Sequence, residues 1–196
     1  MLRAYVFIDQ MNFEIAVTER CVAAKRPLLK LDYGKLPMEI VHRIPNATLS
    51  KTLFFIPRPD EFLMQDQKMA DTYRWAIGLK SMPFFDVIDG EHVSRPTEGR
   101  QKDIHDKSSY YKVEKGTDIN MAVHALAKAF YNAYDMAVFV SGDSDYISIY
   151  SVLKTIGKLT RIIPHVDSHL FLDLDFLESC ERSPAAAQYA NGGMKS

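Results

Sequence analysis

The stretch Met136-Ala-Val-Phe-Val-Ser-Gly-Asp-Ser-Asp-Tyr146 decides the fold of this chain. Its first part, residues 136–140, is an apolar run, which predicts a strand buried on both faces. The run breaks at Ser141, and Asp143 and Asp145 follow before a helical pattern begins. The two acids therefore lie where a parallel strand passes into a helix, at the sheet edge where open α/β folds bind ligands.

Asp143 and Asp145 admit two explanations. Carboxylates this close repel each other unless a cation or a proton holds them, and a hard divalent cation with oxygen ligands meets that need. Alternatively, an acid after a strand caps the next helix and suits its dipole. Capping explains one acid fully but explains two acids beside Gly142 less well, so the pattern favours a metal or catalytic site.

The bulk composition indicates one globular domain. The chain has 196 residues, 47% of them hydrophobic, which is enough for a substantial core. Its net charge is -1, so contact with nucleic acid has to come from a local patch. The two cysteines are far apart, and no apolar run approaches the length of a spanning helix. We therefore expect a protein of the reducing cytoplasm without a membrane segment.

A second acid closes the first predicted strand. Residues 4–8 are β-branched and aromatic, Asp9 ends the run, and Asn12 follows three residues later at the start of a helical pattern. Asn12 is a candidate helix cap. Asp9 is harder to explain structurally, because a carboxylate at the end of a buried strand must find a partner.

The pattern along the chain predicts an α/β three-layer domain. Its central, mostly parallel five-stranded sheet is flanked by helices, over residues 1–182, and residues 183–196 form a small, polar tail that we expect to be disordered. Right-handed crossovers bring the carboxyl ends of the first and fourth strands together, so Asp9 should meet the acids after residue 140. Asp118 can reach them from the start of a helix that we expect Thr117 to cap. The five strands are expected at 4–8, 51–56, 84–88, 136–140 and 159–163.

The polar stretch 90–115 is predicted to be a hairpin or flap. It carries six Lys and Arg against four acids between His92 and Lys115, with Tyr110 and Tyr111 among them. Positive groups with aromatic rings suit single-stranded nucleic acid, in which bases stack and phosphates pair with cations. An ordinary solvated loop is the alternative, in which the two tyrosines pack on the flap.

Three segments together resemble the NYN domains, in the LabA-like branch of the PIN-like nuclease family. Phe7-Ile-Asp-Gln-Met-Asn-Phe13 looks like the first motif of the family, and Glu114-Lys-Gly-Thr-Asp-Ile-Asn120 looks like the second. Residues 132–146, followed by Gly157-Lys158, look like the third and most specific motif. Gln10 is a departure, since the family often has Gly there and a side chain at that position would narrow the site or alter substrate access.

The resemblance implies a PIN-like ribonuclease fold that holds Mg²⁺ or Mn²⁺. Carried over to this sequence, the metal-site acids are Asp9, Asp118, Asp143 and Asp145. Asn12 would orient substrate or a bound water, Ser141 would assist through its hydroxyl, and Lys115 would contact a phosphate.

Three functions stay open at this point. The first is a metal-dependent endoribonuclease acting on single-stranded RNA. The second is a catalytically weak RNA-binding or regulatory module that keeps the fold, an alternative that Gln10 supports. The third and weakest is a phosphatase with an Asp nucleophile, since such enzymes place a second acid where Met11 stands. RNA is the expected partner in the first two cases, and self-association into a homo-oligomer is left open.

Overall fold

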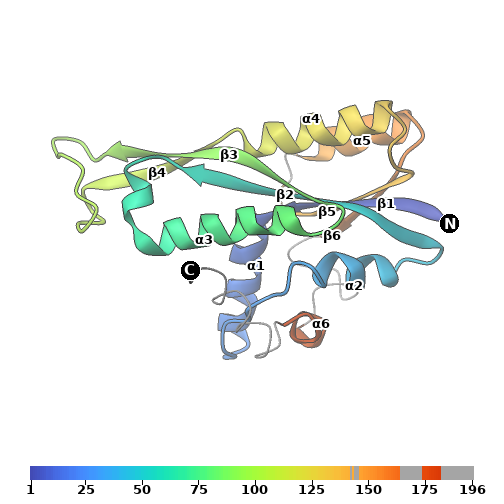
Figure 1. Ribbon diagram of the computed structural model, residues 1–196, viewed down its shortest axis with the longest axis horizontal. Coiled ribbons are helices and arrows are strands. Elements are labelled where there is room, and N and C mark those ends of the chain that lie inside the picture. The colour runs from blue at the N-terminus through green and yellow to red at the C-terminus, as the bar shows by residue number, and fades with distance from the viewer. Residues whose placement is uncertain (142, 144–145, 164–173, 182–196) are drawn as a thin grey trace, which may run out of the picture.

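The computed structural model describes residues 1–141, 143, 146–163 and 174–181. They form a curled, mixed six-stranded sheet with helices on both faces (Figure 1). The strand order is β4-β3-β2-β1-β5-β6. The expected tail at 183–196 and Asp145 lie outside the described residues. The strands are β1 Leu2–Asp9, β2 Ala47–Pro59, β3 Phe85–Pro96, β4 Tyr110–Lys115, β5 Met136–Val140 and β6 Leu159–Ile163.

Two interior strands of the sheet, β1 and β5, are neighbours and are buried as their apolar runs predict. Every residue of β5 is buried, and β1 is buried from Val6 to its end. The two strands pair in parallel, with Ile8 opposite Val140. The residues that follow these two positions, Asp9 and Ser141, therefore leave the sheet side by side.

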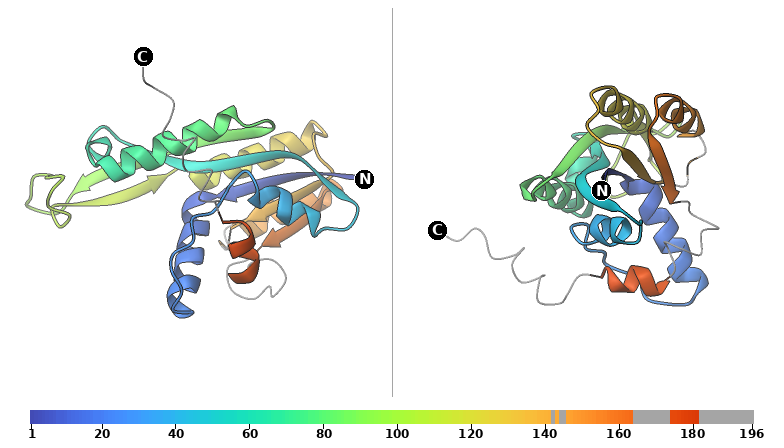
Figure 2. Two further views of the ribbon diagram at one scale, coloured as in Figure 1. Left: turned by 60° about the horizontal axis from the view of Figure 1, so that its bottom comes forward. Right: turned by 90° about the vertical axis from the view of Figure 1, so that its right-hand side faces the viewer.

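Helices cover both faces of the sheet and enclose two separate cores. Figure 1 shows α4 and α5 together on one face and α1, α2 and α3 on the other, with α6 below them; the end-on view in Figure 2 shows the same two layers. The three-layer prediction is confirmed. The helices are α1 Gln10–Ala23, α2 Leu36–His42, α3 Gln67–Gly78, α4 Thr117–Phe130, α5 Ile147–Thr155 and α6 Leu174–Ser179, with 3-10 turns η1 Leu63–Gln65 and η2 Leu79–Ser81.

Alternate residues of the central strands divide between the two cores. Val6 and Ile8 face the core under α1, α2 and α3, whereas Phe7 faces the core under α4 and α5. Phe139 lies beside Phe7 on the same face, with ring centroids 5.1 Å apart. Asp9 continues the alternation of Phe7 and therefore points to the α4–α5 side.

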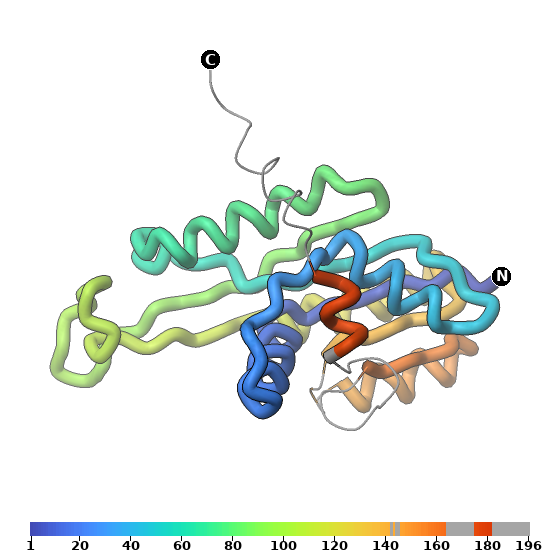
Figure 3. The backbone as a smooth tube through the Cα atoms, turned by 90° about the horizontal axis from the view of Figure 1, so that it is seen from below, coloured from blue at the N-terminus to red at the C-terminus, as the bar shows by residue number. Residues whose placement is uncertain are grey.

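The prediction of a five-stranded, mostly parallel sheet is wrong in number and only partly right in direction. Residues 110–115 form β4, which pairs antiparallel with the second half of β3, whereas the other four strand pairs are parallel. Beyond the helices, β3 and β4 project from the body as a two-stranded arm (Figures 1 and 3). Because most arm residues are exposed or half-buried, no apolar alternation marks β4 in the sequence.

Phe139 tests the core on the α4–α5 side. Its ring is fully buried, whereas Phe130 at the end of α4 is 72% exposed. We expect Phe139→Ala to lower the free energy of unfolding by about 3–5 kcal/mol. Phe130→Ala is the matched control and should change it by less than about 0.5 kcal/mol. Equal losses in urea unfolding of the two variants would contradict the placement of this core.

Candidate functional site

Asp9 is the buried centre of the candidate site. It ends β1, serves as the N-cap of α1, and is 4% exposed. Its Oδ1 accepts a hydrogen bond from the backbone N–H of Asn12 at 3.1 Å. The alternative that Asn12 caps this helix is therefore wrong, because Asp9 is the cap and the backbone N–H of Asn12 donates to it.

Two hydroxyl groups lie near the other carboxylate oxygen of Asp9, Oδ2. The Oγ of Ser141 and the Oη of Tyr146 each lie 3.4 Å from Asp9 Oδ2. Both residues are buried, and the ring of Tyr146 stacks on Phe139 with centroids 6.4 Å apart. Packing of this ring in the core therefore fixes the position of the Tyr146 hydroxyl relative to the Asp9 carboxylate.

Asp118 joins the site through the same tyrosine. The Tyr146 hydroxyl donates a hydrogen bond to Asp118 Oδ1 at 2.6 Å. A phenol has one proton, so its longer contact with Asp9 is a weak second branch, or a bond that Asp9 donates when it is protonated. One hydroxyl therefore ties together acids from β1 and α4 that are 109 positions apart in the sequence.

The start of α4 presents Asp118 to the site. Gly116 occupies the N-cap with φ 80° and ψ -9°, in the left-handed region that favours glycine. Thr117 is the first helical residue and is 1% exposed. The prediction that Thr117 caps this helix is wrong, because the glycine takes the turn and no side chain caps the helix.

Burial and like charge together raise the pKa of Asp9 to about 6. Removal from water contributes most, and the negative charges of Glu114 and Asp118 add to it. The Asn12 amide and the Tyr146 hydroxyl act in the opposite direction but do not offset burial. Within the described part of the chain, neither Asp9 nor Asp118 lies in an ion pair with Lys, Arg or His.

Asp143 lies at the rim, and Asp145 lies outside the described residues. The backbone N–H of Asp143 donates to Ser141 Oγ at 3.3 Å. Burial raises the pKa values of Tyr146 and Tyr150, and the negative charge of Asp143 adds to both. Among residues 1–141, 143, 146–163 and 174–181, no three acidic, His or Cys side chains come together closely enough to hold a metal ion.

Comparison with known proteins decides the family. The NYN domain model matches residues 3–168. This chain belongs to the NYN domain family. No curated protein matches it. A crystal structure of a Vibrio parahaemolyticus protein of unknown function has the same fold, with a TM-score of 0.51 and 15% identity over 92% of this chain and 89% of that one.

Membership in the family gives the acids a chemical context. NYN domains belong to the PIN-like nuclease superfamily, which suggests a ribonuclease with RNA as its substrate. Nucleases of this kind generally depend on a divalent metal ion. The donor set of this NYN domain has the right chemistry for a hard cation, since it offers carboxylate and hydroxyl oxygens and leaves a buried acid without a positive partner among the described residues.

The candidate substrate residues of the NYN domain divide along the β3–β4 arm. Lys115 ends β4, exposed, three residues before Asp118. Tyr111 is 56% exposed, whereas Tyr110 is 5% exposed and packs edge-on against Phe62 with centroids 5.0 Å apart. The ring of Tyr110 is therefore packed as the alternative to base stacking required, although against Phe62 in the segment after β2 and not on the flap itself, and of the two tyrosines only Tyr111 presents a face to solvent.

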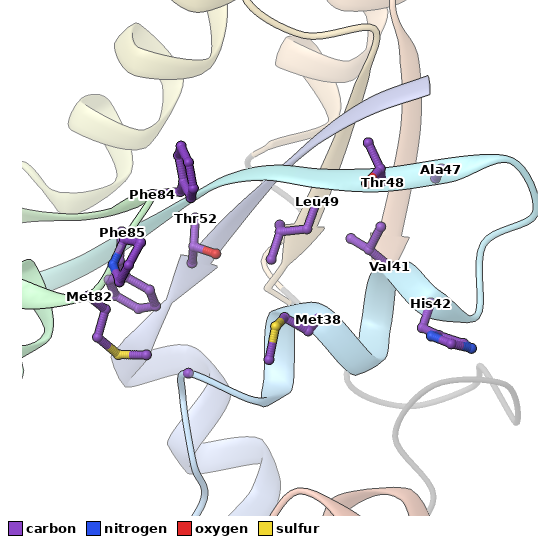
Figure 4. A pocket seen from close by; sticks show the side chains of 12 residues that line it. Met38, Val41, His42, Ala47, Thr48, Leu49, Thr52, Met82, Phe84 and Phe85 are labelled. Carbon is purple, nitrogen blue, oxygen red and sulfur yellow. The ribbon is translucent and has the colours of Figure 1, made fainter. Parts of the chain in front are cut away.

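A pocket lies at the other end of the sheet from the acids. Its cavity volume is about 510 Å³, and it opens between α2, the start of β2 and the segment before β3 (Figure 4). Met38, Leu49 and Phe84 contribute mostly apolar side chains, with Thr52 among them. None of the described residues that line it is an acid, and it lies at the amino ends of β2 and β3, so we do not assign it to the site around Asp9.

No helix in the described part of the NYN domain is long and apolar enough to cross a membrane.

Tyr146 is the site residue that the sequence analysis missed. It occupies the first position of an apolar helical pattern, and its ring does belong to the core. Only its position directly after the acidic segment distinguishes it from an ordinary core aromatic. The hydroxyl on a core ring was the available signal, because a buried phenol needs a hydrogen-bond partner.

The raised pKa of Asp9 makes a stability prediction for the metal-free NYN domain. The pKa is 3.8 in the unfolded reference and about 6 in the fold, so the fold favours the protonated form. Wild-type stability should therefore fall as pH rises from about 4 to 6, by at most about 3 kcal/mol. Asn also caps helices but carries no charge to bury. Asp9→Asn should therefore be more stable than wild type at pH 7.5, where Asp9 is ionised, but not at pH 4, where Asp9 is protonated.

Urea unfolding with a chelator present at both pH values measures this difference. Asp175→Asn is the control, because Asp175 is an acid in the first turn of α6 whose side chain is 90% exposed. It should show no gain at pH 7.5. A loss of stability in Asp9→Asn at pH 7.5 would show that the carboxylate is needed for folding rather than held against a cost.

Proposed function

We propose that this NYN domain is a metal-dependent endoribonuclease that hydrolyses phosphodiester bonds of single-stranded RNA, with Mg²⁺ or Mn²⁺ as its cofactor. The observation that carries the proposal is the meeting of Asp9 and Asp118 on one tyrosine hydroxyl at the carboxyl edge of a NYN-family sheet. An acid pair held by neutral donors keeps its negative charge available for a cation.

The side chains that would hold the cation are Asp9, Asp118 and Asp143, together with Asp145 beyond the described residues. When bound, the ion lowers the pKa of a coordinated water and stabilises charge that develops on the phosphate. The residues of the chain prepare that site. The Asn12 amide fixes the orientation of the Asp9 carboxylate, and the Tyr146 hydroxyl fixes that of Asp118.

The β3–β4 arm supports RNA as the substrate. Arg95 pairs with Tyr111 across the two strands, so their side chains stand on one face of the arm. Both are exposed, as are Lys112 and Lys115 farther along β4. The cations can neutralise phosphates while the tyrosine ring stacks on a base, which favours an unpaired strand.

Other arm cations are less suited to bind phosphate. Arg100 lies 3.6 Å from Asp106, and Lys107 lies 2.5 Å from Asp66. Lys102 hydrogen-bonds Ser94 and covers the ring of Phe62 at 4.4 Å. These contacts hold the tip of the arm together and tie it to the segment between β2 and α3. We therefore assign phosphate contact to Lys115, which ends β4 three residues before Asp118.

The second candidate function is RNA binding without efficient cleavage. Gln10, which follows Asp9 directly, is 6% exposed, so a buried side chain occupies the position where the family often has glycine. A filled position there would restrict the approach of substrate or cation to Asp9.

We also infer that the domain belongs to the LabA-like branch and works in the reducing cytoplasm, where its buried cysteines, Cys21 and Cys180, would remain free thiols.

Substitution of the acids tests the nuclease. A bound cation contributes several kcal/mol to the transition state, so Asp118→Asn or Asp143→Asn should reduce cleavage of a single-stranded RNA by about 10³-fold. Calorimetric titration with Mn²⁺ should show weaker binding in the same variants. Asp175→Asn, an exposed first-turn acid, should match wild type in both assays.

The two functions give different results in this experiment. Metal binding by the wild type with no cleavage in Mg²⁺ or Mn²⁺, and RNA affinity that survives loss of the acids, would support the binding module. Cleavage at an unchanged rate in purified Asp118→Asn would contradict the nuclease site. A wild type that binds neither metal nor RNA would contradict both functions.

Tyr111 tests the arm as the RNA-binding surface. Loss of one base-stacking ring weakens binding of a single strand by about 1–3 kcal/mol. We expect that loss for Tyr111→Ala in a fluorescence anisotropy titration with an oligoribonucleotide. Tyr131→Ala is the control, since Tyr131 is 84% exposed at the end of α4, away from the arm. Equal affinities of the two variants would place the RNA elsewhere.

A further inference from the structure

We propose that Gly90 is a positioning residue for the nuclease site. Three consecutive residues of β3, Asp89, Gly90 and Glu91, contact and support the turn between β4 and α4, and we call these three residues the β3 seat. This β3 seat sets the position of Asp118 against Tyr146. Its catalytic meaning rests on the proposed nuclease function, whereas the geometric claim does not.

The closest approach in the β3 seat is between Gly90 and Thr117. Both residues are buried. A Cβ at position 90 would overlap Thr117 Oγ1, and it would lie 3.0 Å from the Thr117 backbone nitrogen and 3.1 Å from the Lys115 carbonyl oxygen. The last two are backbone atoms, so a rotation of the threonine side chain would not relieve them. Only glycine allows β3 and the start of α4 to lie this close.

The threonine hydroxyl supports a steric role for this contact. Thr117 Oγ1 is buried and has no hydrogen-bond partner among the described residues. A hydroxyl without a partner in a buried position adds no hydrogen-bond energy that would hold the helix there. The position of Thr117 is therefore set by the surrounding backbone, and Gly90 is the surface that it rests on.

Two further contacts hold the turn on either side of Gly90. Glu91 pairs with Lys115 at the end of the antiparallel ladder. The side-chain amide of Asn120 donates to the Asp89 carbonyl at 2.8 Å. The turn between β4 and α4 is thus fixed before and after Asp118, and Gly90 sets its depth in the middle.

The position of Asp118 is sensitive to that depth. Asp118 directly follows Thr117, and its carboxylate accepts the Tyr146 hydrogen bond at 2.6 Å. Tyr146 cannot follow a displaced partner, because its ring is buried against Phe139. A shift of the helix start away from β3 therefore lengthens or breaks the link between the two acids.

Tyrosine NMR of the metal-free full chain tests the β3 seat without activity. The Cζ resonance of Tyr146 in protein labelled with ¹³Cζ-tyrosine is assigned by its loss in Tyr146→Phe. Gly90→Ala should move this resonance, because the Tyr146 hydroxyl loses its acceptor. Gly78→Ala is the control, since a Cβ there meets nothing within 4 Å. An unmoved resonance in folded Gly90→Ala would overturn the proposal.

A second substitution separates positioning from general damage. Thr117→Ala removes the Oγ1 that the new Cβ meets, so it should return the Tyr146 resonance part of the way in the Gly90→Ala background. In the wild-type background it should leave the resonance in place. A double variant that is displaced as far as Gly90→Ala would contradict the steric route. If Gly90→Ala does not fold, Asn120→Ala tests the seat, and an unmoved resonance there would overturn it.

Cleavage then links the β3 seat to catalysis. A displacement of a reacting group by about 1 Å costs about 100-fold, so Gly90→Ala should lower the cleavage rate by about that factor with RNA affinity unchanged. Unchanged cleavage in a variant with a displaced Tyr146 resonance would overturn the link to catalysis. A wild type that does not cleave RNA would contradict the proposed nuclease, and the NMR comparison would still decide the positioning claim.

Discussion

The candidate site is built around one buried carboxylate at the end of strand β1. Asp9 is 4% exposed, and its hydrogen-bond partners among the described residues are a backbone amide and two hydroxyl groups. A carboxylate in such a place keeps its charge at a cost that only a positive partner would remove. Neutral donors orient Asp9 but leave its pKa raised to about 6. The neighbouring elements therefore serve to hold an acid that the fold alone would prefer to protonate.

The topology explains why acids from distant parts of the chain meet there. β1 and β5 are parallel neighbours in the interior of the sheet, so Asp9 and Ser141 leave it at the same edge. Helix α4 connects β4, at one edge of the sheet, to β5, and it crosses over β3, β2 and β1 on the way. Its first turn therefore begins beside the arm, and Asp118 enters the site from the element that joins the arm to the core.

The sequence was sufficient to predict the buried strands β1 and β5 and the approach of Asp118 to Asp9, whereas the convergence of all four acids stays a prediction. Apolar runs determine the two strands, because parallel neighbours share an edge and the residue after each strand must lie there. The arm was not predictable in the same way. β4 is an edge strand exposed on much of its surface, so its pairing comes from backbone hydrogen bonds that leave no apolar period.

The roles of single residues were harder to predict than their positions. Thr117 is a residue type that often caps helices, but Gly116, in the left-handed conformation, occupies the N-cap position of α4. Tyr110 and Tyr111 have the same chemistry, and the alternation of an edge strand buries one and exposes the other. Tyr146 is the first residue of an apolar helical pattern, and its ring packs in the core as that pattern predicts. Its hydroxyl nevertheless links two acids. Periodicity predicts where a ring lies but does not reveal what its polar atom contacts.

Helix capping and catalysis are not competing explanations for Asp9. It does cap α1, as the structural alternative for such an acid requires. Asn, Ser or Thr would make the same hydrogen bond without a buried charge. Capping therefore explains a polar residue at position 9 but not a carboxylate with Glu114 and Asp118 close enough to raise its pKa. Repulsion between these carboxylates destabilises the fold, whereas a cation site requires carboxylates that lie close together.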